Sequence, residues 1–206
     1  TDEEESPAGV WQLKTQNSKL GKSRASQSSF LDVGYNRPVI TPHVPVAVYP
    51  GSFDPFHVGH MSIVERALSI FPRVIIGVLH NAGKDSLFSP AERAAMIAAI
   101  YRDNPAVEVR SFSGLLVNFL REIDATIIIR GMRAVSDFEY EFQMALMNRR
   151  LHPGVETVFL APQEAYLYLS SRLVREGVAL GGDVTGLVPE SVRLRLEERV
   201  RAADRP

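Results

Sequence analysis

The sequence predicts an α/β protein: a doubly wound, Rossmann-like parallel sheet of five strands with helices on both faces. From residue 46 onward, short apolar runs alternate with helical stretches, which is typical of a parallel sheet joined by helical crossovers. The run at 126–129 is apolar on both faces, as expected for a central parallel strand covered on both sides. Right-handed crossovers between such strands give the doubly wound arrangement.

Each strand is a short apolar run bounded by polar or turn residues. We expect strands at 46–49, 74–79, 107–109, 126–129 and 156–161. The first precedes a loop rich in Pro, Gly and Asp, and the second is followed by the polar loop 80–88.

The helices are predicted from apolar spacing and start signals. The first begins near His60 and carries apolar residues three and four positions apart. Ser89 is the expected N-cap of the second, with Pro90 at the first helical position and Glu92 completing a capping box. Further helices are expected at 115–123, from a second capping box at Ser136 and Glu139 to about Arg150, from about Ser171, and after Pro189.

Composition excludes several functional classes. The 206 residues are 45% hydrophobic and 23% charged, enough for one sizeable core. Lys and Arg total 23 against 24 for Asp and Glu, so a basic nucleic-acid-binding surface is disfavoured. The absence of cysteine excludes disulfides and thiolate chemistry and suits the cytoplasm. No apolar run reaches the roughly 18 residues of a membrane span, and the first residues lack a signal-peptide pattern, so a soluble, cytoplasmic protein is predicted.

Residues 1–45 differ in composition from the rest. They contain six serines and four prolines, and few apolar residues outside the segments 30–33 and 38–40. We interpret them as an appended leader or linker, either disordered or acting as a docking peptide for an unknown partner. Residues 46–206 form the predicted catalytic domain.

The loop after the first strand is the strongest candidate for a site. It leads into a helix N-terminus, where backbone N–H groups favour an anion, and it carries His57 and His60. Metal binding by this pair is a weaker interpretation, because only Asp54 offers a third ligand nearby.

Anion-binding groups also follow the other strands. Lys84 lies after the second strand, Arg130 and Arg133 flank Gly131 after the fourth, and the segment 166–172 after the fifth ends in Ser170, Ser171 and Arg172. Ligands of open parallel sheets bind beyond the carboxyl ends of the strands. This set, with no cage of acidic residues and histidines for a metal, predicts a polyanionic substrate.

Two motifs carry a resemblance to a known family. Residues 49–60, Tyr-Pro-Gly-Ser-Phe-Asp-Pro-Phe-His-Val-Gly-His, resemble the signature loop of the HxGH nucleotidylyltransferase superfamily. Residues 129–141, Ile-Arg-Gly-Met-Arg-Ala-Val-Ser-Asp-Phe-Glu-Tyr-Glu, are similar to a segment specific to the bacterial phosphopantetheine adenylyltransferase family. The resemblance covers roughly residues 46–203, and residues 1–45 match nothing in that family.

The resemblance implies reversible transfer of AMP from ATP to 4'-phosphopantetheine, giving dephospho-coenzyme A and pyrophosphate in coenzyme A biosynthesis. His60 corresponds to the residue that stabilises the transition state, and Lys84 and Arg130 to residues that hold the acceptor's phosphate. The implied phosphopantetheine-binding residues are Ser52, Lys84, Leu116 and Arg130. The implied ATP-binding residues are Ser52, Phe53, His57, His60, Gly131, Met132, Arg133, Glu141, Tyr166, Leu167, Tyr168, Leu169, Ser170, Ser171 and Arg172. Arg172 departs from the family, which often has a third serine there.

Because few carboxylates are expected to face the site, we expect Mg²⁺ to arrive with ATP, with no dedicated metal site in the protein. The resemblance also implies a homohexamer. Two other interpretations stay open at this point. The chain could be another HxGH nucleotidylyltransferase, such as a cytidylyltransferase or a nicotinamide mononucleotide adenylyltransferase. It could also be an oligomeric carrier that displays residues 1–45.

Overall fold

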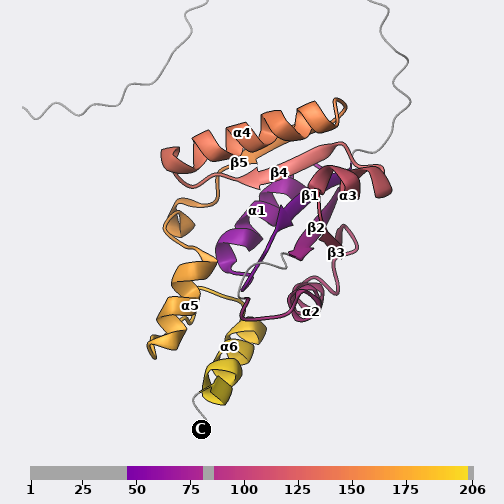
Figure 1. Ribbon diagram of the computed structural model, residues 1–206. Coiled ribbons are helices and arrows are strands. Elements are labelled where there is room, and N and C mark those ends of the chain that lie inside the picture. Colours follow the sequence, from indigo (N-terminus) through magenta and orange to yellow (C-terminus); the bar gives the residue numbers. More distant parts are fainter. Residues whose placement is uncertain (1–45, 81–85, 204–206) are drawn as a thin grey trace, which may run out of the picture. The chain divides into compact units, whose positions relative to one another are not determined.

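The computed structural model describes residues 46–80 and 86–203 (Figure 1). The predicted leader at 1–45 and Lys84 lie outside the described residues. The strands are β1 (Val46–Gly51), β2 (Arg73–His80), β3 (Val107–Ser113), β4 (Ile127–Gly131) and β5 (Glu156–Leu160). The helices are α1 (Val58–Leu68), α2 (Pro90–Ile100), α3 (Leu116–Glu122), α4 (Val135–Leu151), the 3₁₀ turn η1 (Glu164–Tyr166), α5 (Ser171–Ala179) and α6 (Glu190–Ala203).

The described strands form one parallel sheet in the order β3-β2-β1-β4-β5. The chain winds outward from β1 through β2 to β3 and then returns to place β4 on the other side of β1. The predicted fold class is therefore confirmed, and the winding reverses between β1 and β4. In such sheets the reversal opens a crevice at the carboxyl ends of the strands.

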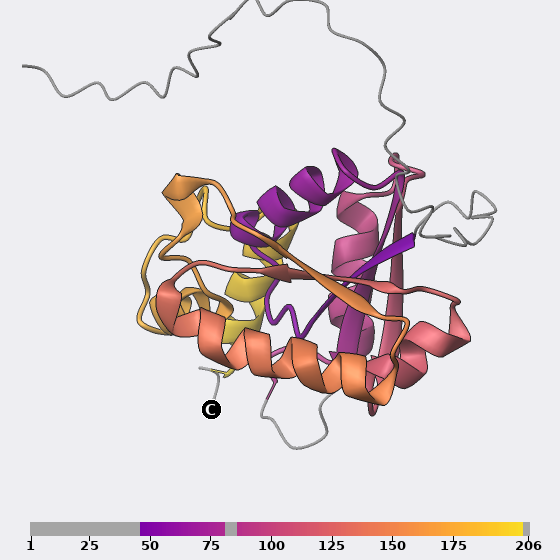
Figure 2. The same cartoon turned by 90° about the horizontal axis from the view of Figure 1, so that it is seen from above.

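Helices cover both faces of the sheet, because successive side chains of a strand point to opposite sides. On one face, Tyr49 and Ile76 pack in a cluster with residues of α1 and α2. On the other, Val48 and Ile75 pack with residues of α3. Figure 2 shows α1 and α4 on opposite sides of β4 and β5. Each face thus has its own apolar core.

A separate apolar cluster attaches the C-terminal helices to α2. Val174 of α5, Leu196 of α6 and Met96 of α2 belong to it, together with Leu169 just before α5. The guanidinium of Arg199 also lies 5.0 Å from the centre of the Phe88 ring. This packing fixes the position of the N-terminus of α5 relative to the sheet.

Of the two capping boxes predicted from the sequence, one is confirmed and one is wrong. The capping box at α2 is confirmed: Glu92 N donates to Ser89 Oγ at 3.2 Å and Ser89 N donates to Glu92 Oε2 at 2.8 Å. The second predicted capping box is wrong, because α4 already begins at Val135 with Ala134 as N-cap. Ser136 is therefore the second residue of the helix instead of its cap.

Candidate active site

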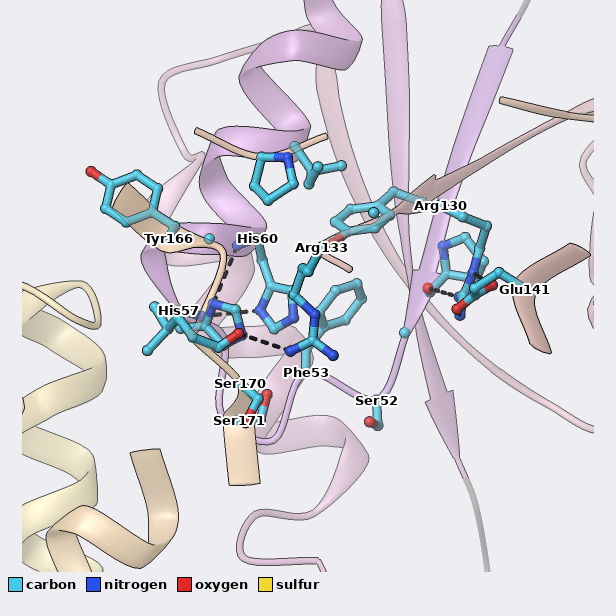
Figure 3. A pocket seen from close by; sticks show the side chains of 18 residues that line it. Ser52, Phe53, His57, His60, Arg130, Arg133, Glu141, Tyr166, Ser170 and Ser171 are labelled. Carbon is cyan, nitrogen blue, oxygen red and sulfur yellow. Dashed lines mark hydrogen bonds and ion pairs between the residues drawn. The ribbon is translucent and has the colours of Figure 1, made fainter. Parts of the chain in front are cut away.

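A cavity opens where β1 and β4 separate. β1 pairs with β2 as far as Gly51, and β4 pairs with β5 as far as Gly131, but the pairing between β1 and β4 ends at Val48 and Ile128. Beyond that point the two strands diverge toward their carboxyl ends. The resulting cavity of about 320 Å³ is lined by residues of both strands and of the segments that follow them (Figure 3).

His57 and His60 form the first wall of this cavity and also start α1. His57 is the N-cap, and its Nδ1 accepts a hydrogen bond from His60 N at 3.3 Å. In return, His60 Nδ1 accepts from His57 N at 3.2 Å. The spacing of the two histidines is thus that of a capping box, with imidazoles in the places that Ser and Glu usually occupy. For this reason α1 begins at Val58, two residues before the predicted start.

This cap fixes the tautomer of both rings. A ring nitrogen that accepts a hydrogen bond carries no proton, so both Nδ1 atoms are unprotonated and each neutral ring carries its proton on Nε2. Gly59 leaves room for the arrangement, since a Cβ there would lie 3.0 Å from both Nδ1 and Cε1 of His57. The histidines therefore offer Nε2–H donors while their other nitrogens hold the helix start.

Burial keeps both rings neutral. It lowers the pKa of His57 to about 3, helped by the positive charge of Arg133. It also lowers the pKa of His60 well below its usual value, and His57 and Arg133 add to the effect. The His60 ring centroid lies 3.5 Å from that of His57 and 5.0 Å from that of Phe53. At neutral pH, His60 is thus a neutral hydrogen-bond donor.

We expect the thermal midpoint of the protein to fall as pH is lowered from 7 to 5. The unfolded chain takes up a proton on His57 near its ordinary pKa of 6.5, whereas the folded protein resists it until about pH 3. The neutral state of buried His57 therefore adds stability above pH 6.5, and this stability is lost as the pH falls. At pH 5 the free energy of unfolding is lower by about 2 kcal/mol if His57 stays neutral in the folded protein. In His57→Asn, which keeps an N-cap acceptor, the fall measured by circular dichroism should be smaller; an equal fall would contradict this account.

Arg133 joins this wall to the start of α5. Its Nη1 donates to Leu169 O at 2.9 Å, and its Nε donates to Asp137 at 3.3 Å. Ser170 is the N-cap of α5, and its Oγ accepts from Leu173 N at 3.2 Å. Backbone N–H groups of the first turn of α5 and a guanidinium thus lie at one side of the cavity, which suits an anion.

Arg130 and Glu141 lie on the opposite side in Figure 3. Arg130 Nε donates to Glu141 Oε2 at 2.6 Å, Nη2 donates to Oε1, and Nη1 donates to Pro50 O at 3.0 Å. Burial alone would lower the pKa of Arg130, but the Glu141 carboxylate outweighs it and raises that pKa. Arg130 is therefore a fixed cation at the end of β4.

A second cavity of about 440 Å³ adjoins the first. Both cavities are lined by Ser52, Arg130 and Glu141, so these residues form their shared boundary. Elsewhere the second cavity is mainly apolar. Its side chains from α3, α4 and the neighbouring strands include Leu79, Leu116, Tyr140, Met144, Met147 and Leu151. The arrangement fits two ligands that meet beside Ser52 and Arg130, one of which lies against a mainly apolar lining.

The structure brings most of the expected site residues together. Those that line the first cavity are Ser52, Phe53, His57, His60, Arg130, Gly131, Arg133, Glu141, Tyr166, Leu169, Ser170 and Ser171. Leu116 lines the second cavity. Met132, Leu167, Tyr168 and Arg172 line neither, and Lys84 lies outside the described residues. Arg172 pairs with Glu176 and its side chain is 81% exposed, so it does not face the cavity.

Sequence reasoning missed several lining residues. Tyr49 lines the first cavity, and burial raises the pKa of its hydroxyl, which therefore stays protonated. Met144 and Met147 line the second cavity from α4. Their spacing of three residues along a predicted helix, on the same face as Tyr140, was an available signal.

Among residues 46–80 and 86–203, no group of three or more His, Cys, Asp or Glu side chains could hold a metal ion. Glu141, which lines both cavities, is engaged by Arg130, and Asp54 in the loop after β1 is engaged by backbone N–H groups. In the same part of the chain, no helix has both the length and the apolar character needed to cross a membrane.

Several known proteins are similar to this chain in sequence or in fold. The cytidylyltransferase-like family model matches residues 48–177. The phosphopantetheine adenylyltransferase of Moorella thermoacetica is 52% identical over 154 residues, 75% of this chain and 96% of its own length. That of Clostridium tetani is 51% identical over 147 residues, 71% of this chain and 92% of its own length. In fold, the chain is similar to a putative nicotinate-nucleotide adenylyltransferase from Vibrio parahaemolyticus, with 18% identity, a TM-score of 0.53 and coverage of 74% of this chain and 97% of that one. The chain therefore belongs to the phosphopantetheine adenylyltransferase family, within the cytidylyltransferase-like nucleotidylyltransferases.

Proposed function

We propose that this protein transfers AMP from ATP to 4'-phosphopantetheine, reversibly, giving dephospho-coenzyme A and pyrophosphate in coenzyme A biosynthesis. The observation that carries the proposal is the pair of cavities that meet at Ser52 and Arg130 in a chain about 50% identical to phosphopantetheine adenylyltransferases. We also keep the sequence-based proposal that it acts in the cytoplasm.

The first cavity is the proposed ATP site. His60 offers its Nε2–H to the α-phosphate, and Arg133 with the first turn of α5 faces the other phosphates. Ser171 Oγ donates to Pro55 O at 2.9 Å, so it fixes the loop instead of contacting ATP through its hydroxyl proton. Arg172, which points away, is not part of the proposed site.

The second cavity is the proposed site of the acceptor. Its apolar lining from α3 and α4 suits the uncharged pantetheine arm, while Arg130 at the boundary suits the phosphate. A fixed guanidinium can bind phosphate oxygens at well-defined angles. Glu141 keeps it in place, and we assign Glu141 this orienting role in addition to its proposed proximity to ATP.

The proposed reaction needs no general base. A phosphate oxygen of the acceptor, already anionic, attacks the α-phosphorus of ATP in line, and the bond from the α-phosphorus to the bridging oxygen of the β-phosphate breaks to release pyrophosphate. His60 and Arg130 stabilise the charge that develops on the transferring group. Mg²⁺ would arrive with ATP, held mainly by phosphate oxygens and water, and would neutralise phosphate charge.

One assay tests the proposal. The full chain is incubated with ATP, Mg²⁺ and 4'-phosphopantetheine, and pyrophosphate release and product mass are measured. CTP in place of ATP tests the cytidylyltransferase alternative. Nicotinamide mononucleotide in place of 4'-phosphopantetheine tests the nicotinamide mononucleotide adenylyltransferase alternative. Dephospho-coenzyme A formed only with ATP and phosphopantetheine is the expected result. If none of these substrate combinations gives a product, the result favours the interpretation as an oligomeric carrier.

We further propose that the protein is a homohexamer in which α4 lies at an interface between copies. Phe138 and Phe142 stack with ring centroids 5.5 Å apart, and Leu146 follows one turn later. These three side chains are 46%, 46% and 48% exposed. By helical periodicity they lie opposite Met144 and Met147, which line the second cavity. A contiguous apolar stripe of this kind suits a second copy of the chain.

Phe142→Glu is expected to lower the mass of the assembly from that of six chains, because it places a carboxylate within an apolar interface. Size-exclusion chromatography with light scattering measures the mass directly. Leu194→Glu on α6 is the matched control, since Leu194 is 48% exposed, close to the 46% of Phe142. A wild type that runs as a single 22.8-kDa chain would exclude the hexamer.

We propose a domain boundary near residue 45. The alignments with the two relatives above span 147 and 154 residues and cover 92% and 96% of the relatives' own length. This supports the interpretation of residues 1–45 as an appended segment. Deleting residues 1–44 is expected to leave adenylyl transfer and the thermal midpoint nearly unchanged. Loss of folded, active protein after this deletion would make the segment an integral part of the domain.

A further inference from the structure

The loop between β1 and α1 is held by side chains from distant helices. Its carbonyl groups at Ser52 and Asp54 accept hydrogen bonds from Arg93 of α2 and Arg175 of α5, respectively. The carboxylate of Asp54 accepts from Leu87 N at 2.8 Å and from Phe88 N at 3.1 Å. The shape of this loop therefore depends on tertiary contacts more than on local backbone preference.

The loop needs such support. Phe53 adopts a φ of +50°, in the left-handed region that non-glycine residues rarely occupy. Its ring is buried and packs edge-on against His60 and Tyr49. A conformation of this kind persists only where the surroundings over-determine it. If the carbonyl before Phe53 lost its partner, the loop would be free to relax and would move Ser52.

Arg93 is the most buried of these supporting groups, with 2% exposure. Its Nε donates to Phe88 O at 3.0 Å, and its Nη1 donates to Leu79 O at 3.2 Å and to Ser52 O. Asp54 adds a favourable charge, although burial lowers the pKa of Arg93. One guanidinium thus joins the end of β2, the chain before α2 and the loop after β1.

The three carbonyls that Arg93 binds lie close to the candidate active site. They are at the carboxyl ends of β1 and β2 and just before α2, at the edge of the sheet where the cavities open. Ser52 forms the boundary of both cavities, and Leu79 lines the second. Without this guanidinium the carbonyls would lose their hydrogen-bond donor, which is costly for buried groups. Arg93 thus fixes the backbone between the two proposed ligands.

We propose that Arg93 is a positioning residue for adenylyl transfer: it holds the Ser52 backbone so that the acceptor phosphate and the α-phosphate of ATP meet in line. This inference rests on the proposed function. Arg93 contacts neither ligand in this scheme and acts through the Ser52 carbonyl. Displacement of aligned groups by about 1 Å can lower a rate about 10²-fold, so the effect appears in kcat.

Two substitutions separate alignment from folding. Arg93→Met keeps the length and packing of the side chain but has no donor, and we expect a kcat loss of about 10²-fold. Arg93→Lys keeps the charge but cannot reach three carbonyls at fixed angles, and we expect a loss of about 10-fold. In both, the KM for ATP should change far less than kcat. Arg199→Met is the matched control, because Arg199 also contacts the start of α2, through Glu92 and Phe88, and lines neither cavity.

The kinetics are measured at a temperature where circular dichroism shows each variant fully folded, with Arg93→Ala assayed with and without millimolar guanidinium chloride. Partial recovery of kcat with guanidinium, but not with equal sodium chloride, is the expected result. Folded Arg93→Lys with wild-type kcat overturns the proposal. Failure of Arg93→Lys to fold overturns it as well, because Arg93 would then serve the fold. An inactive wild type would instead refute the proposed function.

Discussion

Replacing His60 with alanine is expected to lower kcat for adenylyl transfer about 10²-fold or more, while the affinity for ATP changes much less. Because the Nδ1 of His60 accepts a hydrogen bond from His57 N, the ring presents Nε2–H as its donor. Burial keeps this ring neutral by lowering its pKa, so the donor is the same throughout the neutral range. In the proposed reaction, its bond to the α-phosphate strengthens as negative charge develops there, which affects the transition state more than the bound substrate.

The alanine variant also loses part of the cap of α1, so a second substitution is needed. His60→Gln keeps an acceptor at the third position of the helix, which can still bond the backbone of His57, but it lacks the ring. Both variants should lose kcat, whereas only His60→Ala should lose thermal stability as well. Steady-state kinetics, ATP titration by calorimetry and thermal melts measure the three effects. Unchanged kcat in folded His60→Gln would remove His60 from the mechanism.

The fold was predictable because its signals are local. The apolar runs and the Ser89 capping box are read directly from neighbouring residues, and the parallel sheet follows from their alternation with helices. The prediction of an N-cap at Ser136 was wrong because it relied on the same local signals. Ala134 has no capping side chain, yet it is the N-cap of α4. The start of a helix that follows a loop at the ligand-binding edge depends on the conformation of that loop. The pattern of capping residues alone does not predict that conformation.

The candidate site was predictable only as far as its residues lie at or just beyond the carboxyl ends of strands. Arg130 is near the end of β4, Arg133 follows β4 and His60 follows β1, and the topology brings them to one edge. The divergence of β1 and β4 was not predictable, because it depends on pairing between segments about 80 residues apart. Arg93 gave no signal either, since an arginine inside an amphipathic helix is usually a solvated side chain. Two of its three carbonyl partners, Ser52 O and Leu79 O, come from segments that only the folded chain brings next to α2.

Replacing Arg130 or Lys84 with alanine is expected to weaken binding of 4'-phosphopantetheine about 10²-fold, as for the loss of a partner from a charged, hydrogen-bonded pair. The structure supports the assignment for Arg130, which is held by Glu141 and Pro50 O at the boundary of the two cavities. For Lys84 the prediction rests on the family resemblance. Arg73→Ala is the control, because Arg73 is an exposed arginine at the start of β2 that pairs with Glu108 and lines neither cavity.

The deciding comparison uses pantetheine, which lacks the phosphate. If the two cations act on the phosphate, pantetheine should bind the wild type and both variants almost equally poorly by calorimetry, while only the wild type gains from the phosphate. Arg130→Ala also leaves the Glu141 carboxylate without its partner, and that charge would itself repel a phosphate. The double variant Arg130→Ala with Glu141→Gln removes this repulsion, so the loss that remains measures the guanidinium contact. A wild type that binds unphosphorylated pantetheine much better than the variants do would contradict the assignment, because the cations would then be acting on the arm or on the fold.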